Sequence, residues 1–390
     1  MWYLKRGLAL VAVLAAIAKI GFLIFGPGIA ERSMNVVRDH SRYDISPEAQ
    51  ALHDSLVIGD WHADTLLWKR DINSRAKRGH VDVPRLIEGN VALQVFTAVT
   101  KSPRGLNYER NLADAPDDIT LLSIGQLWPP RTWNSLAERA LYQADKLQRA
   151  AKTSAGRLRV IRSKADLDTL LAENVAGAHV VGGIFGIEGA HALEGSLENL
   201  DRLDQAGLRV VGLQHFFDNE LGGSLHGVRD HGLTDFGRQV VNEAIARGMV
   251  LDLAHSSPAV ARDVLEVTDI PLVVSHTGIR SHCESKRNLP DELMRRFAAT
   301  GGVIGIGYWA SVTCDDSPAG VAAAIRAAIN VVGEDHVSLG SDFDGTVTTA
   351  FDTSELAALT QAMMDIGLSR SQIRKVSGEN MLRVLRARLE

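Results

Sequence analysis

Seven side chains that can bind metals or transfer protons stand at or near the ends of apolar stretches in this sequence. They are His62, Asp64, Glu188, His215, His255, His276 and Asp342. Imidazole and carboxylate groups bind borderline metals such as zinc, and they act as general acids and bases in hydrolysis. A single histidine beside an apolar strand is more often a hydrogen-bonded structural residue than a ligand. The recurrence of such residues in equivalent positions indicates one shared metal site.

The first pair, His62 and Asp64, lies in the stretch VIGDWHADTLL at residues 57–67. Residues two apart in a β-strand point to the same side of the sheet, so this imidazole and this carboxylate should face the same way. Such a pair can share a zinc ion, or the two side chains can simply hydrogen-bond each other. The histidines that fall in helices or loops are predicted to be structural. These are His53, His80, His179, His226 and His336.

The sequence contains eight apolar stretches, and most of these stretches contain or end at one of the seven residues. A helical pattern follows most of the stretches. The predicted strands begin at Val57 and cover residues 92–99, 182–190, 209–216, 249–257, 271–278, 301–309 and 336–345. Alternating strands and helices with nearly continuous apolar strands predict a parallel sheet covered by helices. Eight units predict a closed (β/α)8 barrel, whose active site forms at the carboxyl ends of the strands. An open doubly wound sheet is the alternative, but no G-x-G-x-x-G turn follows the first strand.

Capping signals support the helical parts of this pattern. Ser46 followed by Pro47 predicts a short helix before the first strand. Ser135 and Glu138 form a capping-box signature for a helix that runs to about Lys152, inside a long charged insertion at residues 100–160. This helix is predicted to be ordinary packing surface.

Length and charge limit the class of protein. The chain has 390 residues, of which 45% are hydrophobic, and a formal net charge of −5. One large barrel domain at residues 31–390 fits this length. The small net charge and the absence of a long basic run argue against nucleic-acid binding.

Residues 1–30 differ in kind from the rest of the chain. Lys5 and Arg6 precede an apolar run from Leu8 to Phe25, which only Lys19 interrupts, and Gly26-Pro27-Gly28 is expected to break the segment. Such a segment is a signal peptide or a membrane anchor, of which we favour the anchor. Basic residues before the run stay in the cytoplasm by the positive-inside rule. We therefore expect the barrel domain to be exported, either anchored outside the cytoplasm or, if the segment is cleaved, secreted.

Several motifs taken together resemble the membrane (renal-type) dipeptidases, a branch of the amidohydrolase superfamily of metal-dependent barrels. The matching segments, in order, are GDWHADTL, GIEGAHAL, GLQHF, GMVLDLAHSS, VVSHTG, SKRNLPDE and GSDFDG. They extend over about residues 50–385. The resemblance implies a zinc-dependent hydrolase of dipeptides.

The resemblance also implies which residues bind metal. His62 and Asp64 would bind one zinc ion, His255 and His276 would bind a second, and Glu188 would bridge the two. Two neighbouring dications need an anionic bridge, which many barrels of this superfamily supply with a carboxylated lysine. None of the predicted strand ends carries a lysine, so Glu188 has to serve. A hydroxide between the metals would be the nucleophile.

The substrate residues follow from the same resemblance. His215 and Arg287 would hold the substrate, with His215 stabilising the oxyanion. Arg287 offers a planar fork for a free α-carboxylate, the group that distinguishes a dipeptide from the interior of a longer chain. Asp342 would bind substrate and act as the acid and base, although Asp344, two residues later, is an alternative. The insertion and the segment DNELGGSLHG after His215 depart from the family and are expected to border the pocket.

The two cysteines, Cys283 and Cys314, could form a disulfide in an exported protein or remain reduced in the cytosol. The resemblance implies that they are paired. Other functions remain open at this point: hydrolysis of a β-lactam or an N-acyl amino acid on the same metals, or a metal-free, membrane-tethered interaction protein that has kept the barrel and lost catalysis. A homodimer is also left open.

Overall fold

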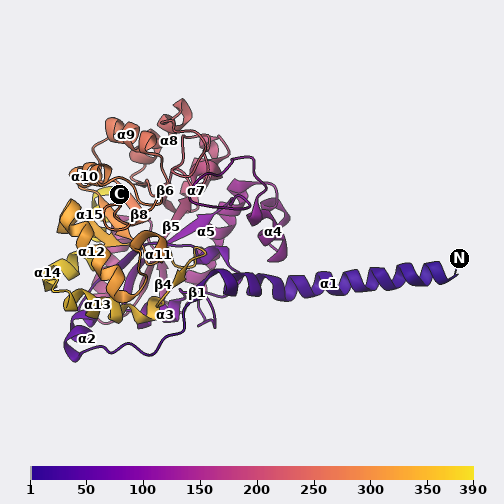
Figure 1. Cartoon of the computed structure of the whole chain (residues 1–390), viewed down its shortest axis with the longest axis horizontal. Coiled ribbons are helices and arrows are strands. Elements are labelled where there is room, and N and C mark those ends of the chain that lie inside the picture. The colour runs from indigo at the N-terminus through magenta and orange to yellow at the C-terminus, as the bar shows by residue number, and fades with distance from the viewer. Residues whose placement is uncertain (1) are drawn as a thin grey trace.

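A closed barrel of eight parallel strands forms the centre of the computed structural model, which describes residues 2–390 (Figure 1). Hydrogen-bonded neighbours run from β3 through β2, β10, β9, β8, β7 and β6 to β5, and the pairing of β3 with β5 closes the ring. The strands are β2 (Ile58–Ala63), β3 (Val91–Val99), β5 (Val181–Glu188), β6 (Leu208–Gly212), β7 (Val250–Asp252), β8 (Val273–Thr277), β9 (Val303–Ile306) and β10 (Val337–Leu339). The predicted (β/α)8 barrel is confirmed.

Helices surround the barrel, and polar side chains begin most of them. Ser135, Thr234 and Ser257 each accept a hydrogen bond from a backbone N–H in the first turn of the following helix. The helices are α2 (Pro47–Asp54), α3 (Val83–Glu88), α4 (Asp118–Gly125), α5 (Leu136–Thr153), α6 (Lys164–Val175), α7 (Leu197–Gln205), α8 (Asp235–Ala246), α9 (Pro258–Val267), α10 (Asp291–Ala299), α11 (Ala310–Thr313), α12 (Pro318–Val332), α13 (Leu356–Asp365), α14 (Arg370–Arg374) and α15 (Asn380–Arg388).

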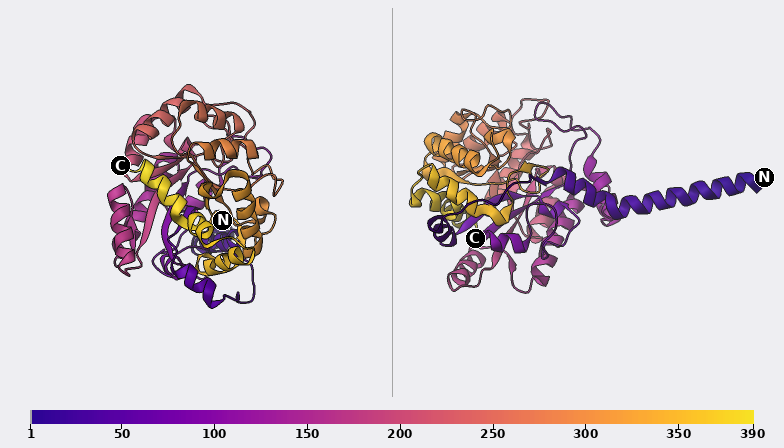
Figure 2. Two further views of the ribbon diagram at one scale, coloured as in Figure 1. Left: turned by 90° about the vertical axis from the view of Figure 1, so that its left-hand side faces the viewer. Right: turned by 60° about the horizontal axis from the view of Figure 1, so that its bottom comes forward.

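The last helix, α15, closes the end of the barrel at which the strands begin. Its buried residues Met381 and Leu385 pack with Trp61, Val250 and Val303 from inside the barrel. Figure 2 (left) shows α15 lying across this end of the molecule. In barrels of this kind the active site forms at the opposite end, where the strands finish.

The insertion contains one strand that the sequence did not predict. The short β4 (Leu158–Val160) pairs with the beginning of β5. Since β3 occupies one edge of β5 along residues 182–188, β4 shares the other edge with β6. A run of three residues with an arginine in the middle carries too little periodicity to be recognised as a strand.

The first helix, α1 (Trp2–Met34), continues through the segment that was expected to break it. The prediction of a break at residues 26–28 is therefore wrong, because Pro27 lies inside the helix. Contacts beyond the proline hold the last turns in place: Glu31 is buried and pairs with Arg70 and Arg78. After α1 the chain adds β1 (Val36–Val37), which pairs with β11 (Thr348–Thr349).

In Figure 1, α1 projects away from the barrel as one long rod. Among residues 2–390, no helix combines the length and the apolarity needed to cross a membrane.

Candidate active site

Four histidines converge on the carboxylate of Glu188 at the carboxyl ends of the strands. His255 Nε2 lies 3.0 Å from Glu188 Oε1, and His62 Nε2 and His276 Nε2 each lie 3.4 Å from the same oxygen. His215 Nε2 lies 3.2 Å from the other oxygen, Oε2. Burial alone would raise the pKa of Glu188, but the neighbouring His215 and His62 hold this pKa well below its usual range. Glu188 is therefore an anion at the centre of the cluster, as its predicted bridging role requires.

Asp64 joins this cluster from the end of β2. Its Oδ1 lies 3.5 Å from His62 Nε2, so the two side chains face the same way, as their spacing predicts. Thr97 on β3 donates a hydrogen bond of 2.6 Å to the same carboxylate oxygen and thereby orients Asp64, a role that was not evident from the sequence. Burial alone would lower the pKa of His62, but Glu188 and Asp64 raise this pKa well above its usual value. The two carboxylates thus favour a positive charge at His62 Nε2, which a bound metal ion would supply.

Ser275 and Asp252 orient two of the histidines from behind. Ser275 Oγ donates to Asp252 Oδ2 at 2.6 Å, so it can only accept from the ring nitrogens that face it. These are His276 Nδ1 at 2.8 Å and His62 Nδ1 at 3.2 Å. Both rings must then carry a proton on Nδ1, and Nε2 faces the cluster as the nitrogen that can bind metal.

The arrangement of these donor atoms fits metal ions. Three groups of three buried residues each bring their possible ligand atoms together, and within each group these atoms lie within 4.8 Å of one another. The groups are His62, His276 and Asp342; Glu188, His215 and His255; and His62, Asp64 and Glu188. The Nε2 atoms of His255 and His276 are only 3.0 Å apart, and His62 Nε2 is buried without a hydrogen-bond partner. Burial also holds the pKa of His255 and of His276 well below the usual value, so both rings are neutral. Imidazoles crowded in this way around carboxylates are a donor set that could hold metal ions.

A cavity of about 390 Å³ opens above this cluster. Its floor includes Asp64, Glu188, His215, His255 and His276, and its walls include Arg287 and Asp342. His62 lies beneath it. The predicted site residues are thus brought together around one small cavity of the size that a dipeptide would need.

Arg287 lies beside His276 and is enclosed by the protein. Its side chain is fully buried and donates to the carbonyl oxygens of Ala254, at 2.7 Å, and His276, at 2.8 Å. These two bonds use only part of its five N–H groups and hold the guanidinium plane against the cavity wall. Two other basic residues, Lys286 in the same loop and Arg229, would be alternative partners of a substrate carboxylate, but they do not line the cavity.

Asp342 and Asp344 occupy different environments. Asp342 lines the cavity, and burial raises its pKa well above the usual value. Asp344 points away: it pairs with Arg70 and accepts hydrogen bonds from the Thr65 hydroxyl and the His80 backbone. The geometry therefore favours Asp342 over Asp344 as the acid and base.

The insertion forms one wall of the cavity through side chains that the sequence did not single out. Ser102, Leu106, Asn107, Tyr108 and Ile119 line the cavity. The Tyr108 hydroxyl accepts a hydrogen bond of 3.0 Å from the Trp309 indole N–H on the opposite side. Of the stretch around His215, Phe216 lines the cavity, whereas the DNELGGSLHG segment does not. Both segments were expected to border the pocket, and of the two only the insertion lines the cavity.

The histidines predicted to be structural lie outside the donor cluster. His53 contacts Thr360, and His80 accepts a hydrogen bond from the Asp344 backbone. His226 is nearest to the site, because its ring stacks on Phe216. Burial lowers its pKa to about 3, so it is neutral and serves as an aromatic support of the cavity wall.

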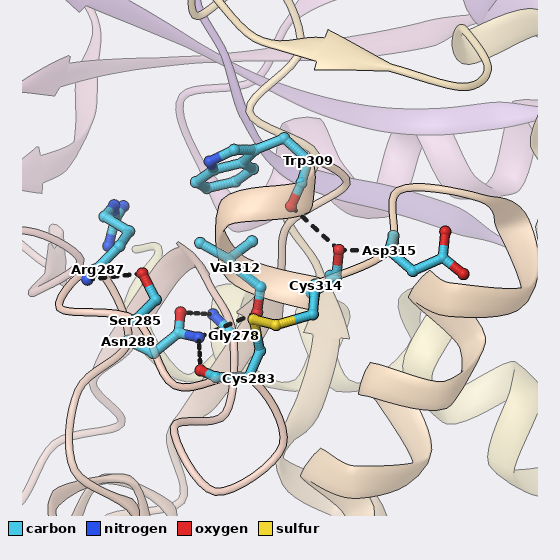
Figure 3. Close-up of a disulfide and its surroundings, with 10 residues drawn as sticks. Gly278, Cys283, Ser285, Arg287, Asn288, Trp309, Val312, Cys314 and Asp315 are labelled. Atoms are coloured by element: carbon cyan, nitrogen blue, oxygen red, sulfur yellow. Dashed lines mark hydrogen bonds between the residues drawn. A yellow bond between two sulfur atoms is a disulfide. The ribbon is translucent and has the colours of Figure 1, made fainter.

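A disulfide joins Cys283, in the loop after β8 that also carries Arg287, to Cys314 at the end of α11 (Figure 3). Asn288 completes this connection by donating to the carbonyl oxygens of Cys283 and Val312. The loop after β8 is therefore fixed to α11, which follows β9.

The fold and the site together define a (β/α)8 barrel with a cluster of histidines and carboxylates, at the carboxyl ends of its strands, that could bind metal. The chain matches the sequence profile of the membrane dipeptidase family (peptidase family M19) over residues 46–389, and it belongs to this family. Members of the family are metal-dependent.

Curated relatives of this chain are described as dipeptidases. The chain is 28% identical to the dipeptidase tcpJ of Claviceps purpurea over 317 residues, which cover 79% of this chain and 69% of that protein. It is 35% identical to the dipeptidase aclJ of Aspergillus oryzae over 215 residues, which cover 53% of this chain and 51% of that protein. The chain thus spans about half the length of aclJ.

Solved structures agree with the barrel. A dipeptidase described as a metallopeptidase of family M19 superposes with a TM-score of 0.68 at 27% identity, covering 86% of this chain and 99% of that one. A metallopeptidase of Rhodobacter sphaeroides, solved with a phosphinate mimic of the dipeptide L-Ala-D-Ala, superposes with a TM-score of 0.65 at 26% identity, covering 85% of this chain and 99% of that one.

Proposed function

We propose that this protein is a zinc-dependent dipeptidase that hydrolyses dipeptides with a free C-terminal carboxylate. The observation that carries the proposal is the convergence of His62, His215, His255 and His276 on Glu188, at the floor of a small cavity with Arg287 in its wall. Membership of the family and the dipeptide mimic bound to the Rhodobacter sphaeroides protein support the same reaction.

Each part of the reaction has a residue suited to it. His62 and Asp64 would hold one zinc ion, His255 and His276 would hold the other, and Glu188 would bridge them. Bound there, two dications would lower the pKa of a shared water and polarise the scissile carbonyl. Ser275 keeps His62 and His276 in the tautomer needed for binding.

Proton transfer falls to Asp342. A peptide nitrogen leaves only when it is protonated, and a carboxyl group in the cavity can accept a proton from the attacking water and deliver it to that nitrogen. Burial raises the pKa of Asp342, which makes its protonated form accessible. His215, whose Nδ1 faces the Lys101 carbonyl at 3.3 Å, presents Nε2 to the cluster and can stabilise the developing oxyanion from there.

Metal analysis combined with a hydrolysis assay tests the proposal. Protein purified without chelator should contain about two zinc ions per chain, because five ligands with one shared carboxylate are too many for a single tetrahedral site. Glu188→Ala should lose metal and the hydrolysis of dipeptides, whereas Glu198→Ala, at an exposed position of α7, should keep both. A zinc content near one that Glu188→Ala leaves unchanged would contradict the binuclear site.

The same assay separates the alternatives. Turnover of β-lactams or N-acyl amino acids without turnover of dipeptides would assign the metals to another amide hydrolysis. Protein that contains no metal and hydrolyses none of these substrates would favour a metal-free interaction protein.

We also propose that the chain is exported and held at a membrane through its N-terminal segment. The basic residues followed by an apolar run support this, and so does the Cys283–Cys314 disulfide, because disulfides persist in oxidising compartments. Alkylation of protein taken directly from its native compartment tests the proposal. Two free thiols there would contradict export.

A further inference from the structure

The exposed large apolar side chains of this molecule are concentrated in two segments. Among the side chains that the structure describes, ten of them lie on α1, five lie between residues 106 and 127, and only Val175 lies elsewhere. We call the second group, together with Phe22, Phe25 and Ile29 of α1, the apolar platform. Its members from the insertion are Leu106, Leu112, Leu121, Ile124 and Leu127. Apolar side chains scattered singly over a surface need no explanation, whereas a concentration of this kind marks an interaction surface.

The two parts of the apolar platform are held together. Phe22 and Pro27 of α1 lie against Gly125 at the end of α4. The salt bridges of Glu31 with Arg70 and Arg78 fix the base of α1 to the barrel. Because α1 is fixed to the barrel, a surface that binds α1 would always meet the same side of the barrel.

An apolar groove of about 420 Å³ runs between α1 and α4, and it adjoins the active-site cavity. The two share five lining residues: Leu67, Ser102, Leu106, Ile119 and Thr346. The opening of the catalytic cavity thus lies beside the apolar platform. At the other end of the molecule, α15 closes the barrel, and Val175 lies there beside Leu382.

A lipid surface accounts for α1 better than a second protein copy does. Between Leu8 and Phe25 the sequence has one charged residue, Lys19, and every exposed side chain that the structure describes in this stretch is apolar. A partner copy would cover one side of such a helix, whereas lipid hydrocarbon covers all sides. The apolar side chains of α4 extend this surface to the catalytic domain, as those of a helix lying in the membrane interface do.

We propose that the apolar platform seats the catalytic domain on a lipid bilayer, with α4 in the interfacial layer and the opening of the cavity facing the lipid. Substrates then enter from the water layer at the bilayer surface. This narrow approach admits a dipeptide more readily than a folded protein.

Lipid-borne quenching tests this orientation in the full-length chain. Leu121→Cys places a thiol on α4, and Val175→Cys places the matched thiol at the closed end of the barrel; Leu121 is 55% exposed and Val175 is 90% exposed. Cys283 and Cys314 are paired, so a fluorescent maleimide labels only the introduced thiol. Each labelled protein is reconstituted into phosphatidylcholine vesicles that contain a phosphatidylcholine spin-labelled near its headgroup.

The spin-labelled lipid should quench the label at position 121 at least threefold more strongly than the label at position 175, and aqueous iodide should show the reverse order. Neither residue lines the cavity, so dipeptide hydrolysis checks that both variants are folded. Equal lipid quenching at both positions would overturn the proposal. Crosslinking between copies of the Leu121→Cys variant through the introduced thiol, without lipid quenching, would also overturn it and assign the platform to a dimer. Neither result would affect the proposed peptidase activity, which the hydrolysis assay measures separately.

Discussion

At the scale of single residues, Ser275 decides how the site can work. One hydroxyl accepts from the Nδ1 atoms of both His62 and His276 while it donates to Asp252. The geometry follows from β8, in which Ser275 and His276 are consecutive, and from β7, which ends at Asp252, three residues before His255. Such supporting residues cannot be recognised by type, because serine and aspartate occur throughout the chain, and their role depends on the pairing of two strands.

Replacing Asp342 with asparagine should abolish most turnover while both metals and substrate remain bound. An amide has the shape of the carboxyl group, but it cannot shuttle a proton, and general acid–base residues typically contribute about 10² to 10⁴ in rate. The measurement is kcat together with zinc content. Asp344→Asn is the control: it should lower stability, because Asp344 pairs with Arg70. An active Asp342→Asn beside an inactive, folded Asp344→Asn would show that the aspartates are assigned wrongly.

Arg287 should determine the requirement for a free α-carboxylate. A charge-assisted contact of this kind is worth roughly 1.5 to 3 kcal/mol, so amidating the C-terminus of the dipeptide should lower kcat/KM at least tenfold in the wild type. Arg287→Ala should lose this discrimination as well as rate, and Arg287→Lys should restore only part of it. Metal content is measured in each variant, because Arg287 also binds the carbonyl oxygens of Ala254 and His276. Equal discrimination in wild type and Arg287→Ala would place the carboxylate pocket elsewhere.

At the scale of elements, the loops are held to the barrel by a few specific connections. The disulfide fixes the loop after β8 to α11, and Lys146 of α5 donates to the carbonyl oxygens of Leu66 and Trp68, just after Asp64. The strand ends carry the residues of the site, and these connections keep the chain beyond the strand ends in position.

Removing the disulfide should lower the free energy of unfolding by about 3 to 4 kcal/mol, because the cystine closes a loop of 31 residues in the unfolded chain. Chemical denaturation of wild type and of the double variant Cys283→Ser/Cys314→Ser measures the difference. A reducing agent should destabilise only the wild type. No difference between the two proteins would contradict this estimate.

Lys146 should make stability depend on pH. Burial lowers its pKa to about 7 in the folded protein, whereas in the unfolded chain it is near 10.5. Between these values the unfolded state binds more protons, so the contribution of Lys146 to stability increases as the pH rises from about 7 to about 10. The stability difference between wild type and Lys146→Met should change over this range, while Lys152→Met, at an exposed position of the same helix, should follow the wild type. Parallel curves for wild type and Lys146→Met would contradict the shift.

At the scale of the whole molecule, the sequence predicted the barrel, its strand order along the chain and the residues at its strand ends, because periodicity and apolar runs are local signals. It did not predict β4, the course of α1 through Pro27, or the burial of Arg287. Each of these depends on contacts between segments far apart in sequence, such as Glu31 with Arg70 and Arg78. Tyr108 was missed for the same reason, since its partner Trp309 lies 201 residues away.

Closure of the barrel by its first and last strands has a consequence for biosynthesis. β2 pairs with β10, so the ring cannot close until residues 337–339 have been made, and Asp342 follows directly after them. A nascent chain that ends before β10 would carry all of the predicted metal ligands, but on an open sheet and without Asp342. The metal centre is therefore completed only when synthesis is nearly finished.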